Sequence, residues 1–112
     1  MLLILIFLSN LYAITLQEAF DNAPSYENYD KYLVLNSDST YYGGLGLYEG
    51  NILIDGQGAI IDLQSQGGIW IYGDENYPCH LDIRYSSIIN GEYYGLSFGG
   101  LATGNIENCN FI

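Results

Sequence analysis

Two short stretches decide the fold of this chain: IRYSSII at residues 83–89 and IENCNFI at residues 106–112, which lie 23 residues apart. Apolar residues occupy the first, sixth and seventh places of both copies. An earlier copy, IDGQGAIID at residues 54–62, reaches the same register with one or two inserted residues, at offsets of 29 for Ile54 and 28 for Ile61. The chain therefore carries an imperfect repeat.

A second pattern runs between these copies and keeps their order. The stretch LGLY at residues 45–48 matches IWIY at residues 69–72, and GIWI at residues 68–71 matches GLSF at residues 95–98. Each run alternates apolar with small or polar residues, which is typical of a strand with one buried face. Two interleaved patterns predict several strands in each repeat.

A repeat built of such short strands cannot bury its own apolar face, so it must stack on a neighbouring copy. This predicts a solenoid in which equivalent strands lie parallel, about 4.8 Å apart. Ile54, Ile83 and Ile106 would then form one interior stack. Asp62 and Asn90 are candidates for a left-handed corner, because Asn and Asp tolerate positive φ better than most residues.

These residues resemble the right-handed parallel β-helix proteins of the pectin-lyase-like superfamily. The resemblance covers residues 14–112 and rests on ITLQEAF at residues 14–20, NILIDGQG at residues 51–58 and NCNF at residues 108–111. It implies an all-β, right-handed parallel β-helix that begins with a short capping helix. The motifs are specific for the fold and not for an activity.

The expected helix lies near the start of the repeat region. Leu16, Ala19 and Phe20 fall on one helical face, as a plug over the open end of a solenoid requires. Thr15 and Glu18 have the spacing of a capping box. A short surface helix with no such role is the alternative.

The first residues have a different composition. Residues 1–8 form an apolar run that is too short to cross a bilayer and is typical of a signal peptide, with cleavage expected after Ala13. Residues 1–13 are therefore predicted to be a signal peptide, and a buried first strand is the alternative for this apolar run. Residues 14–112 are predicted to form the cap and first coils of one secreted domain. No transmembrane anchor is expected. Because the pattern stops inside a strand at Ile112, we expect the solenoid to be incomplete there and to continue into further coils.

The charge balance limits the class of partner. The formal charge is −11, and Lys31 and Arg84 are the only Lys or Arg residues, which disfavours nucleic acid. Anionic polysaccharide would also be repelled unless Ca²⁺ bridged it. Asp74, Glu75 and Asn76 could offer oxygen ligands, but Ca²⁺ takes six to eight, so a solvated loop is the favoured interpretation. No cofactor is otherwise evident.

The chain has two cysteines, Cys79 and Cys109. They could pair in an oxidising compartment. Cys109 aligns with Ser86 at an inward position, whereas Cys79 is expected in a loop, so a buried thiol at Cys109 is the favoured interpretation. Their spacing lacks the paired pattern of a zinc site.

Candidate catalytic groups do not match a known constellation. Asp55 and Asp82 lie on strands of successive coils and could face one groove, although outward carboxylates are more often solvated. His80 beside Asp82 could act as a base with an orienting partner, or could be structural. Arg84 is the one possible arginine clamp. We assign no catalytic, cofactor-binding or metal-binding residue.

Aromatic residues recur along the predicted coils, and Tyr48 and Tyr72 occupy equivalent positions. They could line a glycan groove, or could stack on one another to stabilise a sheet. Trp70 lies between Ile69 and Ile71 and should therefore point outward. The recurring aromatic residues are Tyr41, Tyr42, Tyr48, Trp70, Tyr72, Tyr93 and Tyr94.

Together these features predict a secreted or cell-surface β-helix scaffold or recognition module, associated with a polysaccharide or cell-surface glycan and non-catalytic in this segment. The alternative is the N-terminal part of a polysaccharide lyase or glycoside hydrolase. A surface adhesin is a third possibility, and it would need a C-terminal sorting domain.

Overall fold

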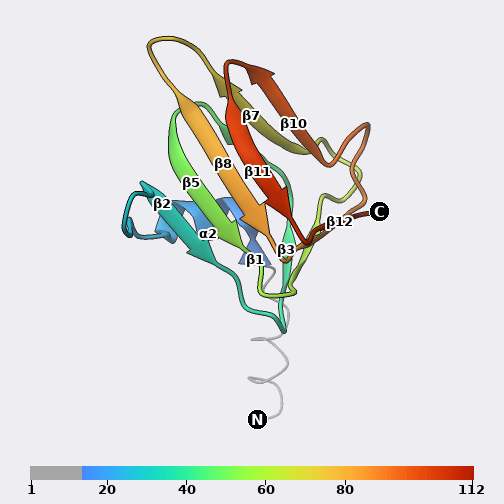
Figure 1. Ribbon diagram of the computed structural model, residues 1–112. Helices are drawn as coiled ribbons and strands as arrows, with labels where there is room; N and C mark the ends of the chain where they lie inside the picture. Colours follow the sequence, from blue (N-terminus) through green and yellow to red (C-terminus); the bar gives the residue numbers. More distant parts are fainter. Residues whose placement is uncertain (1–13) are drawn as a thin grey trace, which may run out of the picture.

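In the computed structural model, which describes residues 14–112, the chain winds into a parallel β-solenoid of about four turns. Three parallel sheets form its walls, and strands from successive coils lie side by side in each sheet (Figure 1). The predicted all-β solenoid is confirmed. The predicted signal peptide lies outside the described residues.

Each coil contributes one strand to each wall in turn. The four-stranded sheet contains β2 (Lys31–Val34), β5 (Gly50–Asp55), β8 (Cys79–Arg84) and β11 (Thr103–Glu107). The five-stranded sheet contains β1 (Ile14–Thr15), β3 (Thr40–Tyr42), β6 (Ile60–Asp62), β9 (Ser87–Ile89) and β12 (Asn110–Phe111). The three-stranded sheet contains β4 (Leu45–Leu47), β7 (Ile69–Gly73) and β10 (Leu96–Gly100).

Residue register across the coils confirms the predicted interior stack. Ile54 pairs with Ile83, and Ile83 pairs with Ile106. The second pattern is confirmed too, because Ile69 pairs with Leu45 on one side and with Leu96 on the other. Like residues therefore lie over like residues along the solenoid.

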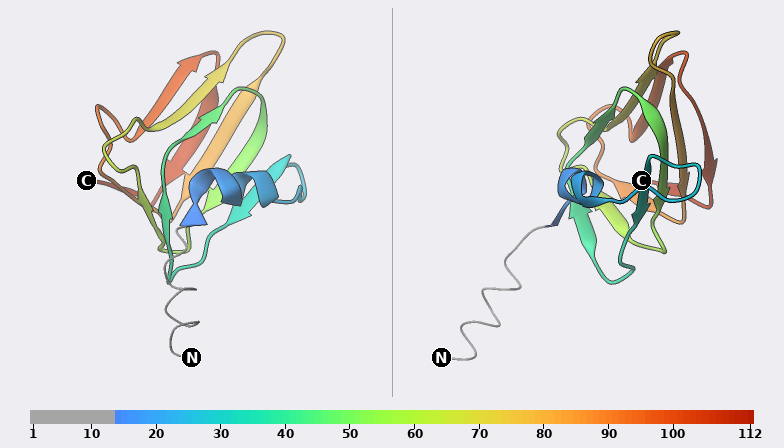
Figure 2. Two further views of the ribbon diagram at one scale, coloured as in Figure 1. Left: turned by 180° about the vertical axis from the view of Figure 1, so that it is seen from behind. Right: turned by 90° about the vertical axis from the view of Figure 1, so that its left-hand side faces the viewer.

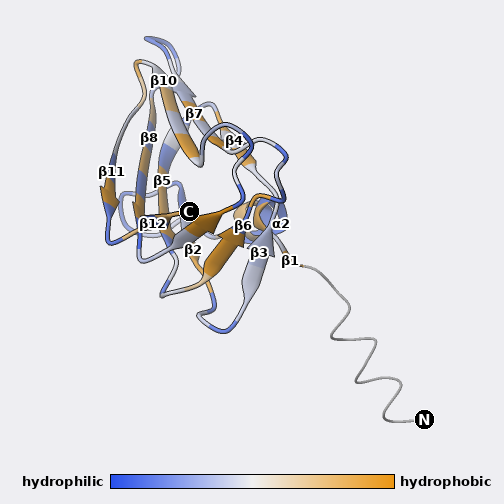
Figure 3. Ribbon diagram, turned by 90° about the vertical axis from the view of Figure 1, so that its right-hand side faces the viewer, coloured by the Kyte–Doolittle hydropathy of each residue, from blue (hydrophilic) through white to orange (hydrophobic). Residues whose placement is uncertain are grey.

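The three sheets surround one aliphatic interior (Figure 3). Burying one Leu or Ile side chain contributes about 1.5–3 kcal/mol to the free energy of unfolding, so the interior is the main source of stability. The stack is less well covered in the last coil, where Phe98, Ile106 and Phe111 are 37%, 47% and 46% exposed. The largest fully buried side chains are Leu16, Leu33, Leu47, Ile52, Ile54, Ile61, Leu63, Ile69, Ile71, Leu81, Ile83 and Ile88.

Helix α2 (Leu16–Asn22) lies across the first-coil end of the solenoid, as predicted (Figure 2). Its N-cap Thr15 accepts a hydrogen bond from the Glu18 backbone N–H at 3.0 Å. Leu16 is fully buried, and Ala19 and Phe20 pack against the core, so this face closes the interior. Within residues 14–112, none of the helices has the length and hydrophobicity to span a bilayer.

The register predicted for β6 and β9 is wrong by one residue. Ile61 pairs with Ile88 and not with Ile89. The corner between β5 and β6 spans residues 56–59, whereas the equivalent corner between β8 and β9 spans only residues 85–86, so the first corner absorbs two extra residues.

The predicted left-handed corner is half right. Asn90 has φ of 58°, but Asp62 is not among the residues with positive φ. The Asp62 carboxylate instead accepts hydrogen bonds from the Gln64 N–H at 2.9 Å and from Asn90 Nδ2 at 3.0 Å. Another corner has left-handed residues in two successive coils, with φ of 52° at both Tyr85 and Asn108.

The predicted loop position of Cys79 is wrong. Cys79 begins β8 and is buried, so it does not lie in a loop. Cys109 is partly buried and packs against the core, and its inward position matches that of the buried Ser86. Both cysteines are free thiols, and burial raises the pKa of each.

Candidate functional site

The outer face of the three-stranded sheet carries an exposed group of aromatic side chains. We call Tyr48, Trp70, Tyr72 and Tyr94 the aromatic face. Ile69 and Ile71 point into the core, so the strand alternation of β7 directs Trp70 and Tyr72 outward. Trp70 is 52% exposed, Tyr72 is 49% exposed and Tyr48, directly after β4, is 58% exposed. The predicted outward orientation of Trp70 is confirmed.

Small residues lie next to these rings, either in a neighbouring coil or in the same coil. Trp70 pairs with Gly46 in one coil and Ser97 in the next, and Tyr72 pairs with Gly99. A Cβ at Gly99 would lie 3.2 Å from a ring carbon of Tyr72, and a Cβ at Gly46 would lie 3.1 Å from the Tyr48 ring. The tyrosine rings therefore lie over glycines.

Trp70 and Tyr94 form a stacked aromatic pair, which we call the platform. Their ring centroids lie 6.4 Å apart with an interplanar angle of 25°, which is a stacked arrangement. Desolvation by burial, followed by the nearby Glu92 carboxylate, raises the pKa of Tyr94, so its hydroxyl is neutral near pH 7. The platform presents ring surface and one hydroxyl.

The other predicted aromatic residues do not join this face. Tyr41 is buried in the five-stranded sheet, and its hydroxyl accepts a hydrogen bond from the Asn36 N–H at 2.8 Å. Tyr42 also belongs to that sheet. Tyr93 is highly exposed and lies outside the strands. The predicted aromatic ladder is therefore confined to four residues.

The outer face of the four-stranded sheet is polar, and Asp82 is at its centre. Asp82 Oδ2 accepts a hydrogen bond from the Tyr29 hydroxyl at 2.6 Å. Asp82 Oδ1 lies 2.8 Å from His80 Nε2 and accepts a hydrogen bond from Asn105 Nδ2 at 2.9 Å. His80 Nδ1 lies 2.7 Å from the hydroxyl oxygen of Thr103. We call these five residues the polar cluster.

The hydrogen bonds of the polar cluster set its protonation states. Burial raises the pKa of the Asp82 carboxyl, but the hydrogen bonds from Tyr29, Asn105 and His80 outweigh burial and hold the pKa below its usual value. The same hydrogen bond to Asp82, together with burial, raises the pKa of Tyr29 to about 12. At neutral pH Asp82 is therefore an anion and Tyr29 a neutral donor.

The remaining predicted site residues lie on the same outer face. Asp55 pairs in register with Arg84, whose Nη2 lies 3.2 Å from Asp55 Oδ2. The hydrogen bond with Asp55 raises the pKa of Arg84. Arg84 therefore forms an ion pair with Asp55. The register partner of Asp82 in that coil is Leu53, which has no charge. The two carboxylates share a face but have different partners.

Sequence reasoning missed three members of the polar cluster. Thr103 and Asn105 lie 23 residues after His80 and Asp82, which is the spacing of the final repeat, so that offset could have found them. Tyr29 lies in a loop ahead of β2, and its contact with Asp82 spans 53 residues. No periodic signal marks Tyr29.

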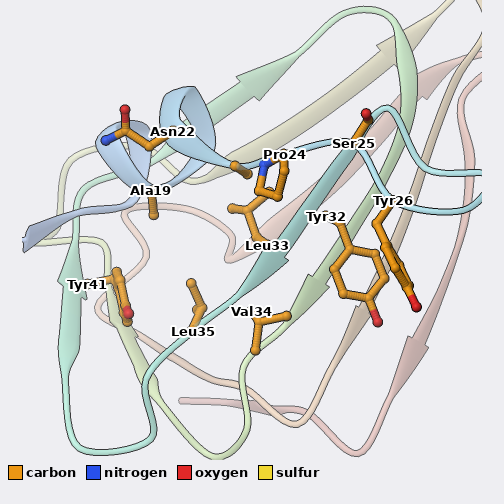
Figure 4. A pocket seen from close by; sticks show the side chains of 11 residues that line it. Ala19, Asn22, Pro24, Ser25, Tyr26, Tyr32, Leu33, Val34, Leu35 and Tyr41 are labelled. Atoms are coloured by element: carbon orange, nitrogen blue, oxygen red, sulfur yellow. The ribbon is translucent and has the colours of Figure 1, made fainter.

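Two of the hollows on the surface differ in their lining. One, with a volume of about 440 Å³, adjoins the polar cluster and is lined in part by Asn51, His80, Leu101 and Thr103. The other, of about 770 Å³, lies between the end of α2 and β2 (Figure 4). Its lining is mostly apolar, and it brings no set of polar groups together. It is lined by Ala19, Asn22, Ala23, Pro24, Ser25, Tyr26, Tyr32, Leu33, Val34, Leu35 and Tyr41.

The loop considered for Ca²⁺ is organised by its own hydrogen bonds. Asp74 Oδ1 accepts hydrogen bonds from the backbone N–H groups of Asn76 and Tyr77, at 2.9 and 2.8 Å. This Asx turn uses the carboxylate to close the loop. Among residues 14–112, no three His, Cys, Asp or Glu side chains converge in a way that could hold a metal ion.

Comparison with known proteins adds no relative: no family model, curated protein or solved structure matches this chain.

Proposed function

We propose that this chain is a secreted or cell-surface recognition module that binds a neutral glycan on its aromatic face. The observation that carries this proposal is the platform of Trp70 and Tyr94, flanked by the half-exposed rings of Tyr48 and Tyr72. The apolar C–H face of a sugar ring packs against an aromatic ring, and the ring hydroxyls remain available for hydrogen bonds.

The shape of the face supports a chain of sugars. Trp70 is flanked in register by Gly46 and Ser97, and its indole remains 52% exposed although it stacks on Tyr94. Trp70 and Tyr72 lie on β7, which is paired with β4 on one side and β10 on the other, so the backbone beneath these two rings is fixed. A sugar can therefore bind without reordering the protein.

The charge of the chain favours a neutral ligand. A formal charge of −11 repels uronate polymers and other anionic glycans over the whole surface. The chain has one lysine, Lys31, and one arginine, Arg84. Arg84 already forms an ion pair with Asp55. We therefore place neutral glucans, mannans and xylans ahead of pectate as ligands.

We further propose a superfamily and a route of export for this chain. The stacked parallel coils and the plugging helix support membership of the right-handed β-helix proteins of the pectin-lyase-like superfamily. The apolar run at residues 1–8 supports export through a signal peptide, which would place the module where glycans are exposed.

The single tryptophan of the chain permits a direct test. Titration of the protein with soluble neutral oligosaccharides should change the emission of Trp70, because a bound sugar displaces water from the indole. Trp70→Ala should weaken binding measured by calorimetry about 30-fold, equivalent to about 2 kcal/mol, the scale of an interface hot spot.

Tyr77→Ala is the matched control, because Tyr77 is as exposed as Tyr48 but lies in the loop between β7 and β8. This variant should bind like the parent protein. Polygalacturonate, with and without Ca²⁺, tests the anionic alternative. Binding that is equally strong in Trp70→Ala, or no binding to any neutral glycan, would contradict the proposal.

A further inference from the structure

Within the polar cluster, a hydroxyl, an imidazole and a carboxylate are joined by two successive hydrogen bonds. Thr103 Oγ1 lies 2.7 Å from His80 Nδ1, and His80 Nε2 lies 2.8 Å from Asp82 Oδ1. Parallel pairing builds this line, because Thr103 on β11 is in register with His80 on β8, and Asp82 follows two residues later on the same face.

The proton positions in this line follow from the donors and acceptors. An ionised carboxylate can only accept, so the neutral imidazole carries its proton on Nε2 and donates it to Asp82. Nδ1 then has a free lone pair directed at the Thr103 hydroxyl, which donates. This is the arrangement in which an imidazole removes a proton from a hydroxyl nucleophile.

The supports and the access are those that a nucleophile needs. Tyr29 and Asn105 hold Asp82 with hydrogen bonds of 2.6 and 2.9 Å, so the carboxylate that orients His80 is fixed by groups from two other coils. Thr103 is exposed, and it lines the hollow of about 440 Å³ together with His80. A small molecule can therefore reach the hydroxyl while its base stays in place.

We propose that Thr103, His80 and Asp82 form a triad that transfers the acyl group of small esters to the Thr103 hydroxyl and then to water. In the first step a bond forms between Thr103 Oγ1 and the ester carbonyl carbon, and the hydroxyl proton moves to His80 Nδ1. The bond from that carbon to the alkoxy oxygen breaks, and the leaving alcohol takes the proton from His80. Water then attacks the acyl carbon while His80 accepts its proton. The bond from that carbon to Thr103 Oγ1 breaks, His80 returns the proton to Oγ1, and the carboxylic acid leaves.

The proposal is tested with a fluorophosphonate on the full chain, followed by peptide mapping by mass spectrometry. In this reaction a bond forms between Thr103 Oγ1 and phosphorus, fluoride leaves, and the hydroxyl proton moves to His80. We expect one adduct, on Thr103, and hydrolysis of 4-nitrophenyl acetate by the unmodified protein. His80→Gln retains a side-chain donor near Asp82 but removes the base, and should slow both reactions about 100-fold.

The other variants separate chemistry from folding. Thr103→Ala should abolish both reactions and should remain folded, because Thr103 is exposed and the variant loses only the hydrogen bond to His80. Thr103→Ser should retain labelling, now on Ser. Ser37→Ala, which removes an exposed hydroxyl in the turn between β2 and β3, should leave both rates unchanged. The proposal is overturned if the folded protein gives no adduct, if the adduct lies on another residue, or if folded His80→Gln reacts as fast as the parent.

Discussion

The outer faces of the three-stranded and four-stranded sheets have the same construction and opposite character. Both lie over the same aliphatic interior and both consist of every second residue of parallel strands. On the four-stranded sheet, the outward side chains meet hydrogen-bonding partners in the neighbouring coil, as Asp82 meets Asn105. On the three-stranded sheet, Trp70 meets Gly46 and Ser97, so the indole remains half exposed.

This difference shows that, in a parallel stack, the residue one coil away decides the use of an outward side chain. A partner of complementary chemistry holds the side chain in a stabilising hydrogen bond or ion pair. A small partner leaves it open to a ligand. The polar cluster should therefore contribute more to folding stability than the aromatic face does, and the aromatic face should contribute more to glycan binding.

The largest difference is expected for Asp82→Ala against Trp70→Ala. Removing the Asp82 carboxylate leaves Tyr29, His80 and Asn105 without their common acceptor, which should lower the free energy of unfolding by about 2 kcal/mol. Trp70→Ala removes an outward, half-exposed ring and its stacking on Tyr94, and should lower the free energy of unfolding by at most about 1 kcal/mol. Urea denaturation of both variants makes the comparison, and equal losses would mean that the two faces do not differ in this way.

A smaller effect is expected for Tyr29→Phe. This change removes one hydroxyl from the polar cluster and retains the ring, which packs against Tyr32 with a centroid distance of 5.9 Å. The free energy of unfolding should fall by about 1 kcal/mol, the usual net contribution of one hydrogen bond. Tyr77→Phe, whose exposed hydroxyl lies in a loop, is the control and should have no measurable effect. If the two variants have equal stability, the contact with Asp82 contributes nothing.

The smallest effect is expected in the dependence of stability on pH. Because the pKa of Asp82 is lower in the folded protein, its contribution is fully present above the unfolded pKa, near 4, and is lost as pH falls through the folded pKa. The parent protein should therefore lose more stability on acidification than Asp82→Asn does. Ser37→Ala, at an exposed turn between β2 and β3, changes no titratable group and should follow the parent curve. Parallel curves for the parent and Asp82→Asn would exclude this linkage.

Much of the interior could be predicted from the sequence. The repeat placed Ile54, Ile83 and Ile106 in one stack, and the alternation around Trp70 correctly gave its outward orientation. These predictions succeed because inward positions must be apolar in every coil, so the pattern is repeated and readable. The capping helix could be predicted for the same reason, since its apolar residues have to face the open end.

The register at one corner and the members of the polar cluster could not be read in the same way. The pairing of Ile61 depends on a corner that takes up two extra residues, and polar corner residues carry no strong pattern. Thr103 and Asn105 are ordinary polar residues until the pairing of β8 with β11 brings them beside His80 and Asp82. Tyr29 reaches Asp82 from a loop, where no periodicity exists.

The sequence by itself determined that this protein is a stack of parallel coils, which side chains lie inside it, and that its surface is acidic. Those properties follow from the hydrophobic effect, which responds to the alternation of residue types along the chain. Only the tertiary structure decided which outward side chains meet. Hydrogen bonds and ring contacts act over a few ångströms between different coils, and the lengths of the corners, more than the pattern of the strands, set those distances.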